Sequence, residues 1–302
     1  MIVRSRPRLL QLFFVMQGSI VPRILPQVLI VAAISVAVIL TGKAWPHLLP
    51  NYSGAPFALV GIAISVFLNF RNSACYDRWW EARKHWGELI LYSRTLSRQT
   101  LILPPQDRTR WLNLTSAFAH ALVQHLRPGF GEEARVTQHL SPQEAARWRA
   151  SRFPPDAILR LMAEDLAARR ADGRIGDIPF QMLDRTLADM SMVQTTCERI
   201  RTTPVPFGYT LLLHRTAYLF CFLLPFGFAE TLGWATLLAT VLVAYTFFGL
   251  DALGDELEEP FGLSANNLPL SALAETIELN MREALGESDL PPLPQPVDHV
   301  LI

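Results

Sequence analysis

Five carboxylates lie close together directly after the last long apolar run of the sequence. They are Asp251, Asp255, Glu256, Glu258 and Glu259. Carboxylate oxygens are the ligands that hard cations such as Ca²⁺ prefer, so this density could bind a cation. The spacing equally favours an acidic helix face that pairs with the arginines of the preceding region. The residues alone leave both interpretations of this acidic cluster open.

Other side chains that catalyse reactions or bind metals form no recognised pattern. Cys75, Cys197 and Cys221 are far apart and form no CxxC motif, which argues against structural disulfides. His120 and His125 share one expected helix without an adjacent carboxylate motif, which favours a solvated or packed pair over a metal site. The sequence contains no phosphate-binding glycine loop, nucleophile elbow or HExxH motif. We therefore expect no enzyme, no metal and no cofactor.

The composition indicates a membrane part and a soluble part. Half of the 302 residues are hydrophobic and the mean hydropathy is +0.22, yet 18% are charged. Such a chain is too apolar for an average soluble protein and too charged to lie entirely in a membrane. The 27 basic residues are balanced by 27 acidic ones, so we expect no nucleic-acid partner.

The stretch from Pro56 to Arg83 joins an uncharged helix to a cluster of charges and tryptophans. Pro56 suits the first helical position, and no charge appears before Arg71. The apolar part is short for a membrane span, so the helix is expected either to continue past Phe70 into water or to lie partly inside protein.

One stripe of this helix carries the bulky residues Ile62, Val66 and Phe70, at a spacing of i, i+4 and i+8. Gly61, Ser65 and Asn69 form a small or polar stripe beside it. Taken alone, such a stripe more often packs against another helix than lines a pore.

Three further apolar runs predict membrane segments: Ile24 to Leu40, Leu211 to Phe228 and Thr231 to Leu250. The last two are expected to be antiparallel and joined by a very tight turn. The pair His214-Arg215 could be a functional charge within the membrane. Its place near the Pro204-Val205-Pro206 break favours the cytosolic interface, where it extends its charge toward water or pairs with a carboxylate. The basic N-terminus predicts, by the positive-inside rule, an inner-membrane protein with both termini in the cytosol.

The region between the two pairs of spans has helical patterns. Its expected helices are Ala82 to Thr100, Trp111 to Leu126, Ser141 to Ala150, Pro154 to about Ala171 and Ile178 to Ile200, and a further one near the C-terminus is Ser271 to Leu285. The expected organisation is a basic cytosolic segment 1–23, spans within 24–70, a cytosolic helical region 71–208, spans within 209–250, cytosolic helices 251–286 and a flexible Pro-rich tail 287–302.

Three motifs make this sequence resemble the bestrophins, specifically their bacterial branch. They are FRNSACYDRWWEARKHWGEL from Phe70, CERIRTTPVPFGYTLLLHRTAYLFCFLLPFG from Cys197, and the acidic run that ends in Glu259-Pro260-Phe261-Gly262. The resemblance implies an all-α membrane protein that forms a homopentameric ion channel. It further implies four transmembrane segments per subunit, a large cytosolic helical region and a conduction path on the fivefold axis.

The resemblance also implies roles for single residues. Ile62, Val66 and Phe70 match the positions that form the pore neck, and Met190 matches a second, cytosolic aperture. An apolar constriction of this kind can gate by dewetting. In animal bestrophins a calcium clasp follows the Pro-Phe-Gly motif as an acidic run. Here Leu263 to Asn267 follow it, so the main clasp ligands are missing and no calcium activation is expected.

The resulting hypothesis is a passive channel for small monovalent ions, either chloride or, as in the bacterial branch, sodium and potassium. The alternative is a non-conducting membrane protein whose arginine-rich cytosolic domain binds a partner. A secondary transporter is less favoured, because four spans without a visible inverted repeat are few for alternating access.

Overall fold

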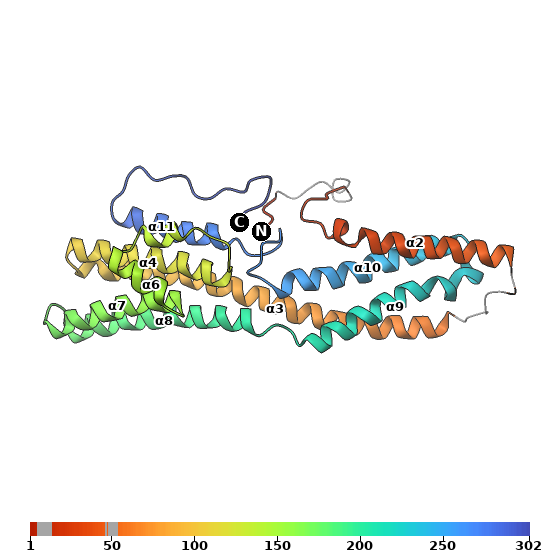
Figure 1. Cartoon of the computed structure of the whole chain (residues 1–302), viewed down its shortest axis with the longest axis horizontal. Coiled ribbons are helices and arrows are strands. Elements are labelled where there is room, and N and C mark those ends of the chain that lie inside the picture. Colours follow the sequence, from red (N-terminus) through yellow and green to blue (C-terminus); the bar gives the residue numbers. More distant parts are fainter. Residues whose placement is uncertain (5–13, 46, 48–53) are drawn as a thin grey trace. The chain divides into compact units, whose positions relative to one another are not determined.

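The structure is a computed structural model that describes all residues except 5–13, 46 and 48–53. Nine residues of the expected basic segment 1–23, and seven residues of the expected loop 41–55 between the first two spans, lie outside the described residues. The described helices are α2 (Val21–Ala44), α3 (Ala55–Gln99), α4 (Pro105–Leu126), α5 (Glu133–Thr137), α6 (Pro142–Ala150), α7 (Pro154–Ala171), α8 (Asp177–Thr202), α9 (Phe207–Leu232), α10 (Ala235–Glu258) and α11 (Leu270–Ala284), with the short 3-10 helix η1 (Thr100–Ile102) (Figure 1).

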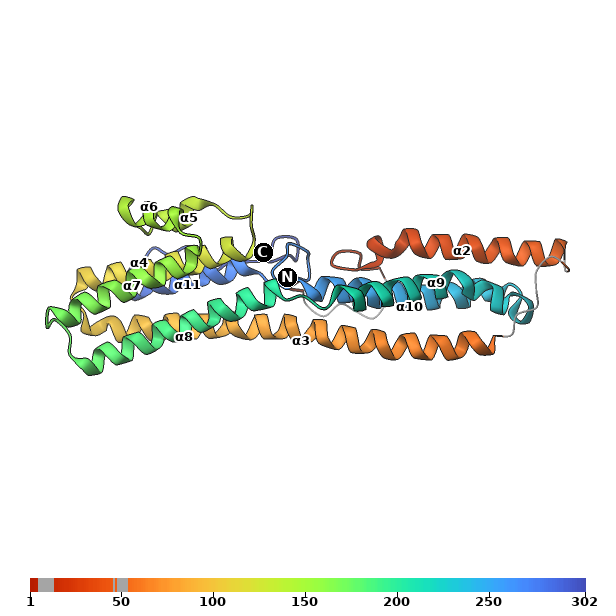
Figure 2. The same ribbon diagram turned by 60° about the horizontal axis from the view of Figure 1, so that its bottom comes forward.

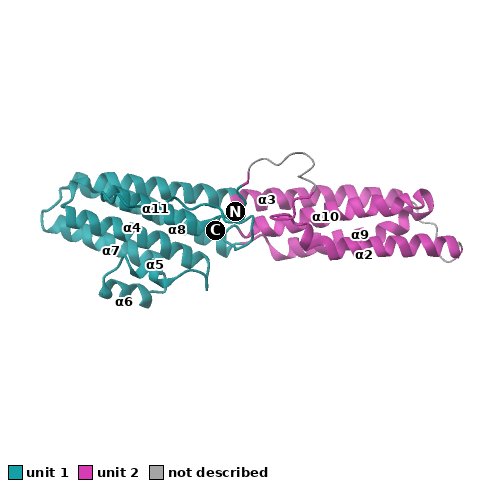
Figure 3. Ribbon diagram, turned by 90° about the horizontal axis from the view of Figure 1, so that it is seen from above, with its two compact units in different colours: residues 1–3, 80–203, 260–302 teal, residues 4–79, 204–259 magenta. Residues whose placement is uncertain are grey.

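The chain divides into two compact units (Figure 3). Residues 4–79 and 204–259 form the first, called the span unit here, and residues 1–3, 80–203 and 260–302 form the second, called the helical unit. Helix α3 contributes residues to both. Among the described residues only isolated β-bridges occur outside helices and turns, so the predicted all-α class is confirmed.

The span unit contains long apolar helices. Four helical stretches are long and apolar enough to cross a membrane: Val21–Ala44, Ala55–Ile102, Phe207–Leu232 and Ala235–Glu258. Helix α2 packs on α9 and α10, which pack on each other; α9 and α10 lie side by side in both ribbon views (Figures 1 and 2). The predicted tight turn is confirmed, because α9 ends at Leu232 and α10 begins at Ala235, with Gly233 at a positive φ of 52° between them.

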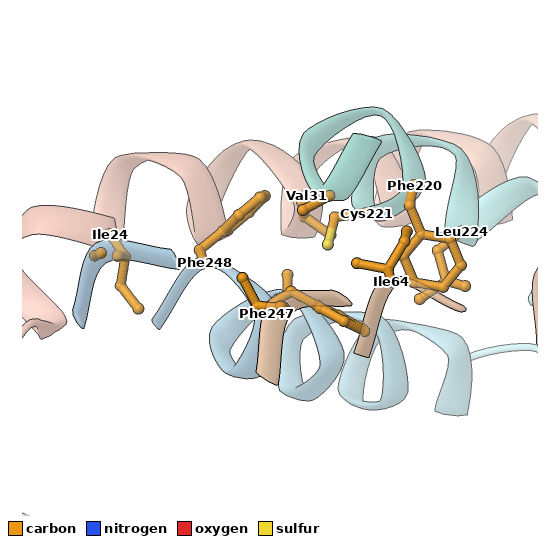
Figure 4. Close-up of a cluster of buried hydrophobic side chains, with 12 residues drawn as sticks. Ile24, Val31, Ile64, Phe220, Cys221, Leu224, Phe247 and Phe248 are labelled. Atoms are coloured by element: carbon orange, nitrogen blue, oxygen red, sulfur yellow. The ribbon is translucent and has the colours of Figure 1, made fainter. Parts of the chain in front are cut away.

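Apolar side chains from all four helices meet in the core of this unit (Figure 4). They come from α2 (Ile24, Val31), α3 (Ile64, Leu68), α9 (Ala217, Phe220, Cys221, Leu224) and α10 (Ala244, Phe247, Phe248, Ala252). Gly227 of α9 allows close approach to α3, since a Cβ there would lie 2.5 Å from the Phe57 ring. The core therefore holds α3 by the face that carries Ile64 and Leu68.

Helix α3 continues without interruption past Phe70 to Gln99. The first of the two predicted outcomes is thus confirmed: the apolar segment and the charged segment belong to one helix. An uninterrupted helix fixes the direction of every side chain along it, so the Ile62, Val66 and Phe70 stripe keeps its register with the charged residues that follow.

The helical unit is built around α4, whose residues from Trp111 to Val123 are almost all buried. Helices α7, α8 and α11 pack on it. Helix α6 begins as expected, with Ser141 as the N-cap directly before Pro142. Ser141 and Glu144 form a capping box. Helix α5 is not predicted from the sequence. The tail after residue 287 has no helix, as expected, and near its end Val300 bridges to Ile2.

Candidate functional site

The three predicted neck residues lie exposed on one face of α3. Ile62 is 63% exposed, Val66 47% and Phe70 59%. On another face of the same helix, Ile64 and Leu68 are buried in the core. Because the subunit buries the second set and leaves the first open, the stripe does not serve packing within the subunit.

The polar group beside this stripe is satisfied locally. The hydroxyl of Ser65 donates to the carbonyl of Ile62 at 2.8 Å, so it presents little unsatisfied polarity to its surroundings. Gly61 lies close to α9, where an added Cβ would be 3.1 Å from the Phe220 ring. The exposed face is therefore an apolar surface on a helix held tightly from the other side.

A buried charge cluster begins one residue after Phe70. The guanidinium of Arg71 donates to Asp251 at 2.9 Å, to Asp255 at 2.6 Å and to Glu258 at 3.3 Å. Its side chain is fully buried, so its charge must be compensated by these partners. The carboxylates come from α10, so the cluster joins α10 to α3 at the end of the neck stripe.

Small residues and further hydrogen bonds complete this cluster. A Cβ on Gly254 would lie 2.5 Å from Asn72 Oδ1 and 3.0 Å from an Arg71 nitrogen, so glycine leaves the space that Arg71 occupies. Asp251 also contacts His214 Nδ1 at 2.7 Å, and Asp255 contacts Arg23 at 2.5 Å. His214 thus pairs with a carboxylate, which is one of the roles expected for the pair His214-Arg215.

The acidic cluster consequently has arginine partners within the span unit. Of its five members, Asp251, Asp255 and Glu258 bind Arg71, while Glu256 lies on α10 and Glu259 follows that helix. Glu258 additionally accepts the backbone N–H of Val205 at 3.1 Å. This geometry favours the arginine-pairing interpretation over a cation site.

Met190 lies in α8 and is 0% exposed. Adding further subunits can only reduce the exposure of a residue, so a side chain that faces a lumen between subunits must already be open in the single subunit. The burial of Met190 counts against its predicted place at the cytosolic aperture.

The loop after the Pro-Phe-Gly motif is held by a side chain that sequence reasoning did not single out. Arg127, at the end of α4, donates to the carbonyls of Phe261 at 2.8 Å, Gly262 at 3.0 Å and Leu268 at 2.6 Å. Burial lowers the pKa of Arg127 to about 10, which still leaves it charged at neutral pH. The three carbonyl oxygens therefore accept hydrogen bonds from a positively charged group.

His120 and His125, which lie on the same helix, have separate partners. His125 lies 3.2 Å from Glu198, and burial lowers its pKa. His120 instead contacts Glu278 at 2.7 Å, and His139 lies 3.6 Å from the same carboxylate. The three cysteines are free and buried, and burial raises the pKa of Cys197 to about 12.

Comparison with known proteins shows consistent similarity over almost the whole chain. The model of the bacterial and fungal bestrophin family matches residues 1–283. A voltage-dependent anion channel-forming protein of Mesorhizobium japonicum is 48% identical over 298 residues, covering 97% of this chain and 95% of the relative. One of the same name from Escherichia coli K12 is 42% identical, covering 96% of each chain. The crystal structure of a bacterial bestrophin homologue from Klebsiella pneumoniae has a TM-score of 0.84 and 39% identity, covering 87% of this chain and 99% of the other.

Proposed function

Because this chain belongs to the bacterial and fungal bestrophin family and is a bestrophin-like ion channel, we propose that small monovalent ions cross it through a neck formed by Ile62, Val66 and Phe70. The relatives are described as channels, so the chain is not an enzyme. It is a membrane protein and an oligomeric channel. The proposal makes that oligomer a homopentamer with its path on the symmetry axis.

The exposure of the three neck residues is the observation that carries this proposal. A fully apolar stripe is open on α3 while the opposite side of the helix is buried. In a pentamer each of these residues becomes a ring of five, and three apolar rings one helical turn apart form a constriction that can gate by dewetting. Arg71 and its carboxylate partners fix α3 at the end of this stripe, which keeps the rings in register.

Single-channel recording of the Ile62→Ala, Val66→Ala and Phe70→Ala triple variant tests the neck. Removing three rings of bulky side chains is expected to raise the conductance or the open probability in planar bilayers. The matched control carries Leu219→Ala, Leu238→Ala and Leu242→Ala, three exposed apolar residues of α9 and α10. Light scattering of the purified protein in detergent establishes the oligomeric state of both variants.

An intact oligomer whose conductance equals that of the wild type would place the neck elsewhere. An intact wild-type oligomer that carries no current under any condition, with neck substitutions that only weaken assembly, would favour the alternative, a non-conducting protein that binds a partner.

The sign of the permeating ion is not determined by the neck, because its side chains carry no charge. The relatives are named for anions, so the proposal predicts a reversal potential near the chloride equilibrium value under a KCl gradient. A reversal potential near the potassium equilibrium value would instead show cation conduction, the other possibility that the sequence leaves open.

The proposed location is the bacterial inner membrane, with both termini in the cytosol. It rests on the basic N-terminal sequence and on Lys43 as the only Lys or Arg between the first two spans. Reporter fusions at residue 302 and within residues 41–55 are expected to report cytosolic and external locations respectively.

A further inference from the structure

Two histidines and a glutamate from three elements of the helical unit converge on one point. His120 comes from α4, His139 follows α5, and Glu278 comes from α11. One ligand atom from each lies within 4.8 Å of the other two. The residues are 19 and 139 positions apart along the chain, so packing of α4, α11 and the segment after α5 brings them together.

The carboxylate of Glu278 lies between the two imidazoles. Its oxygens are 2.7 Å from His120 Nε2 and 3.6 Å from His139 Nε2. The two rings are nearly parallel, with an interplanar angle of 8° and centroids 6.2 Å apart. His120 and Glu278 are buried, and His139 is mostly covered. All three donor atoms thus point into one shielded volume.

The ligand nitrogens of both histidines are engaged in hydrogen bonds that a bound ion would replace, since His120 Nε2 lies 2.7 Å from a Glu278 oxygen. Gln138 Nε2 lies 3.1 Å from His139 Nε2 and 3.5 Å from Glu278, and the half-exposed Arg135 approaches Glu278 only to 4.0 Å. The cluster accordingly offers a carboxylate together with two imidazoles.

This donor set matches the preference of borderline divalent transition metals. Two imidazoles and one carboxylate, with a water molecule as the fourth ligand, form a common open tetrahedral zinc site, whereas Ca²⁺ and Mg²⁺ prefer oxygen alone. Tetrahedral ligands about 2.0 Å from an ion are separated by about 3.3 Å from one another. The separations here, from 2.7 Å to at most 4.8 Å, bracket that value, so small side-chain rotations would admit an ion.

A cavity of about 290 Å³ opens beside His120, and its other lining residues include Glu132, Arg135 and Glu275. His120 is the one ligand of the three that lines this cavity. A cavity of this size has room for the water that would complete the coordination of an ion.

We propose that His120, His139 and Glu278 form a binding site for a divalent transition-metal ion of the zinc class. A bound ion would link α4, α11 and the segment after α5 through three coordination bonds in place of the hydrogen bonds that now join them. The site lies in the helical unit and is independent of the neck proposal.

The test uses the full-length protein purified in detergent, stripped with a chelator and titrated with ZnCl₂ by calorimetry. We expect one Zn²⁺ per subunit and a rise in the thermal unfolding temperature on binding. His139→Ala, which removes the most exposed ligand, is expected to lower the affinity at least about 100-fold and to abolish that rise. Co²⁺ should give the visible absorption of a tetrahedral site in the wild type and not in His139→Ala.

The matched control is His85→Ala. His85 also belongs to the helical unit and lies 2.7 Å from Glu88, but in the described part of the chain it belongs to no group of three candidate metal ligands. This variant should keep the site intact. If the wild type binds no zinc, or if His139→Ala binds it as tightly as His85→Ala, the three residues form a hydrogen-bonded packing cluster and the proposal is wrong. Glu278→Gln provides a second ligand variant, and retained unfolding cooperativity shows whether each variant is folded.

Discussion

The guanidinium of Arg71 lies 2.9 Å from the carboxylate of Asp251, and neither side chain is more than 4% exposed. Arg71 directly follows Phe70 on α3, and Asp251 lies near the end of α10. A buried pair of this kind contributes little net stability when intact, because desolvation offsets its attraction, but breaking it leaves an uncompensated charge. It is therefore best understood as a constraint that allows α3 one position against α10.

Removing Arg71 should be far more damaging than removing an exposed arginine. Arg71→Ala leaves the buried Asp251 with His214 as its remaining partner, and we expect a loss of about 3–5 kcal/mol. Arg147→Ala, which removes an exposed ion pair with Glu164, should change the stability little, because solvent screens that pair. Thermal unfolding of the two purified variants measures the difference. Equal unfolding temperatures would show that the buried pair does not constrain α3.

The burial of Met190 predicts a structural defect instead of a conduction defect. Met190→Ala creates a cavity and is expected to cost about 2–5 kcal/mol with unchanged single-channel conductance. The control is Met192→Ala, which truncates an exposed side chain on the same helix and should change stability by less than about 0.5 kcal/mol. A conductance change in Met190→Ala without loss of stability would restore its predicted place at the aperture.

Arg127 is expected to hold the loop after the Pro-Phe-Gly motif. In Arg127→Ala the carbonyls of Phe261 and Gly262 lose their donor, whereas that of Leu268 still accepts from the backbone N–H of Leu270. Each buried carbonyl left unpaired costs about 1–3 kcal/mol. We expect faster proteolysis within residues 260–268 and a lower unfolding temperature. Arg127→Lys should recover only part of the loss, since an ammonium group lacks the planar fork that reaches several acceptors. Arg149→Ala, an exposed pair with Glu133, is the control. Unchanged proteolysis in Arg127→Ala would contradict this role.

Local signals in the sequence predict the helices well. Uncharged runs predict where each apolar helix begins within about four residues, because any backbone placed in lipid must satisfy its own hydrogen bonds over a fixed length. They do not predict the charged continuations of α3 to Gln99 and of α10 to Glu258. The adjacent residues Ser141 and Pro142 likewise predict the start of α6, as its N-cap and its first helical residue. The spacing places Ile62, Val66 and Phe70 on one stripe but taken alone favours packing against another helix, so their exposure comes from the structure.

Pairings between distant residues could not be predicted in the same way. Arg71 and Asp251 are 180 positions apart, and His120 and Glu278 are 158 apart. Many different arginines of the sequence could pair with the same acidic helix face. Only tertiary packing selects which one does. Met190 shows the same limit, since a methionine on an amphipathic helix suits either a core or an aperture until its neighbours are known.

A last prediction concerns acid stability of the helical unit. Asp165 on α7 accepts hydrogen bonds from Arg169 Nε at 2.6 Å and Trp111 Nε1 at 2.6 Å. Burial alone would raise the pKa of Asp165, but these bonds outweigh it and hold the pKa below the ordinary value of 3.8. A lowered folded-state pKa contributes stability that is fully present above 3.8 and is lost as the pH falls through the folded-state pKa.

Asp165→Asn should therefore destabilise the protein by about 1.5–3 kcal/mol near neutral pH, the range for hydrogen bonds to charged groups. The gap in unfolding temperature between wild type and variant should narrow as the pH is lowered below 3.8, because the wild-type carboxylate becomes protonated there. Asp156→Asn, which alters an exposed pair with Arg160 on the same helix, controls for a general loss of acidic charge and should show a small gap at every pH. A gap for Asp165→Asn that stays constant down to the lowest pH would mean that packing of the side chain, and not its charge, stabilises this part of the unit.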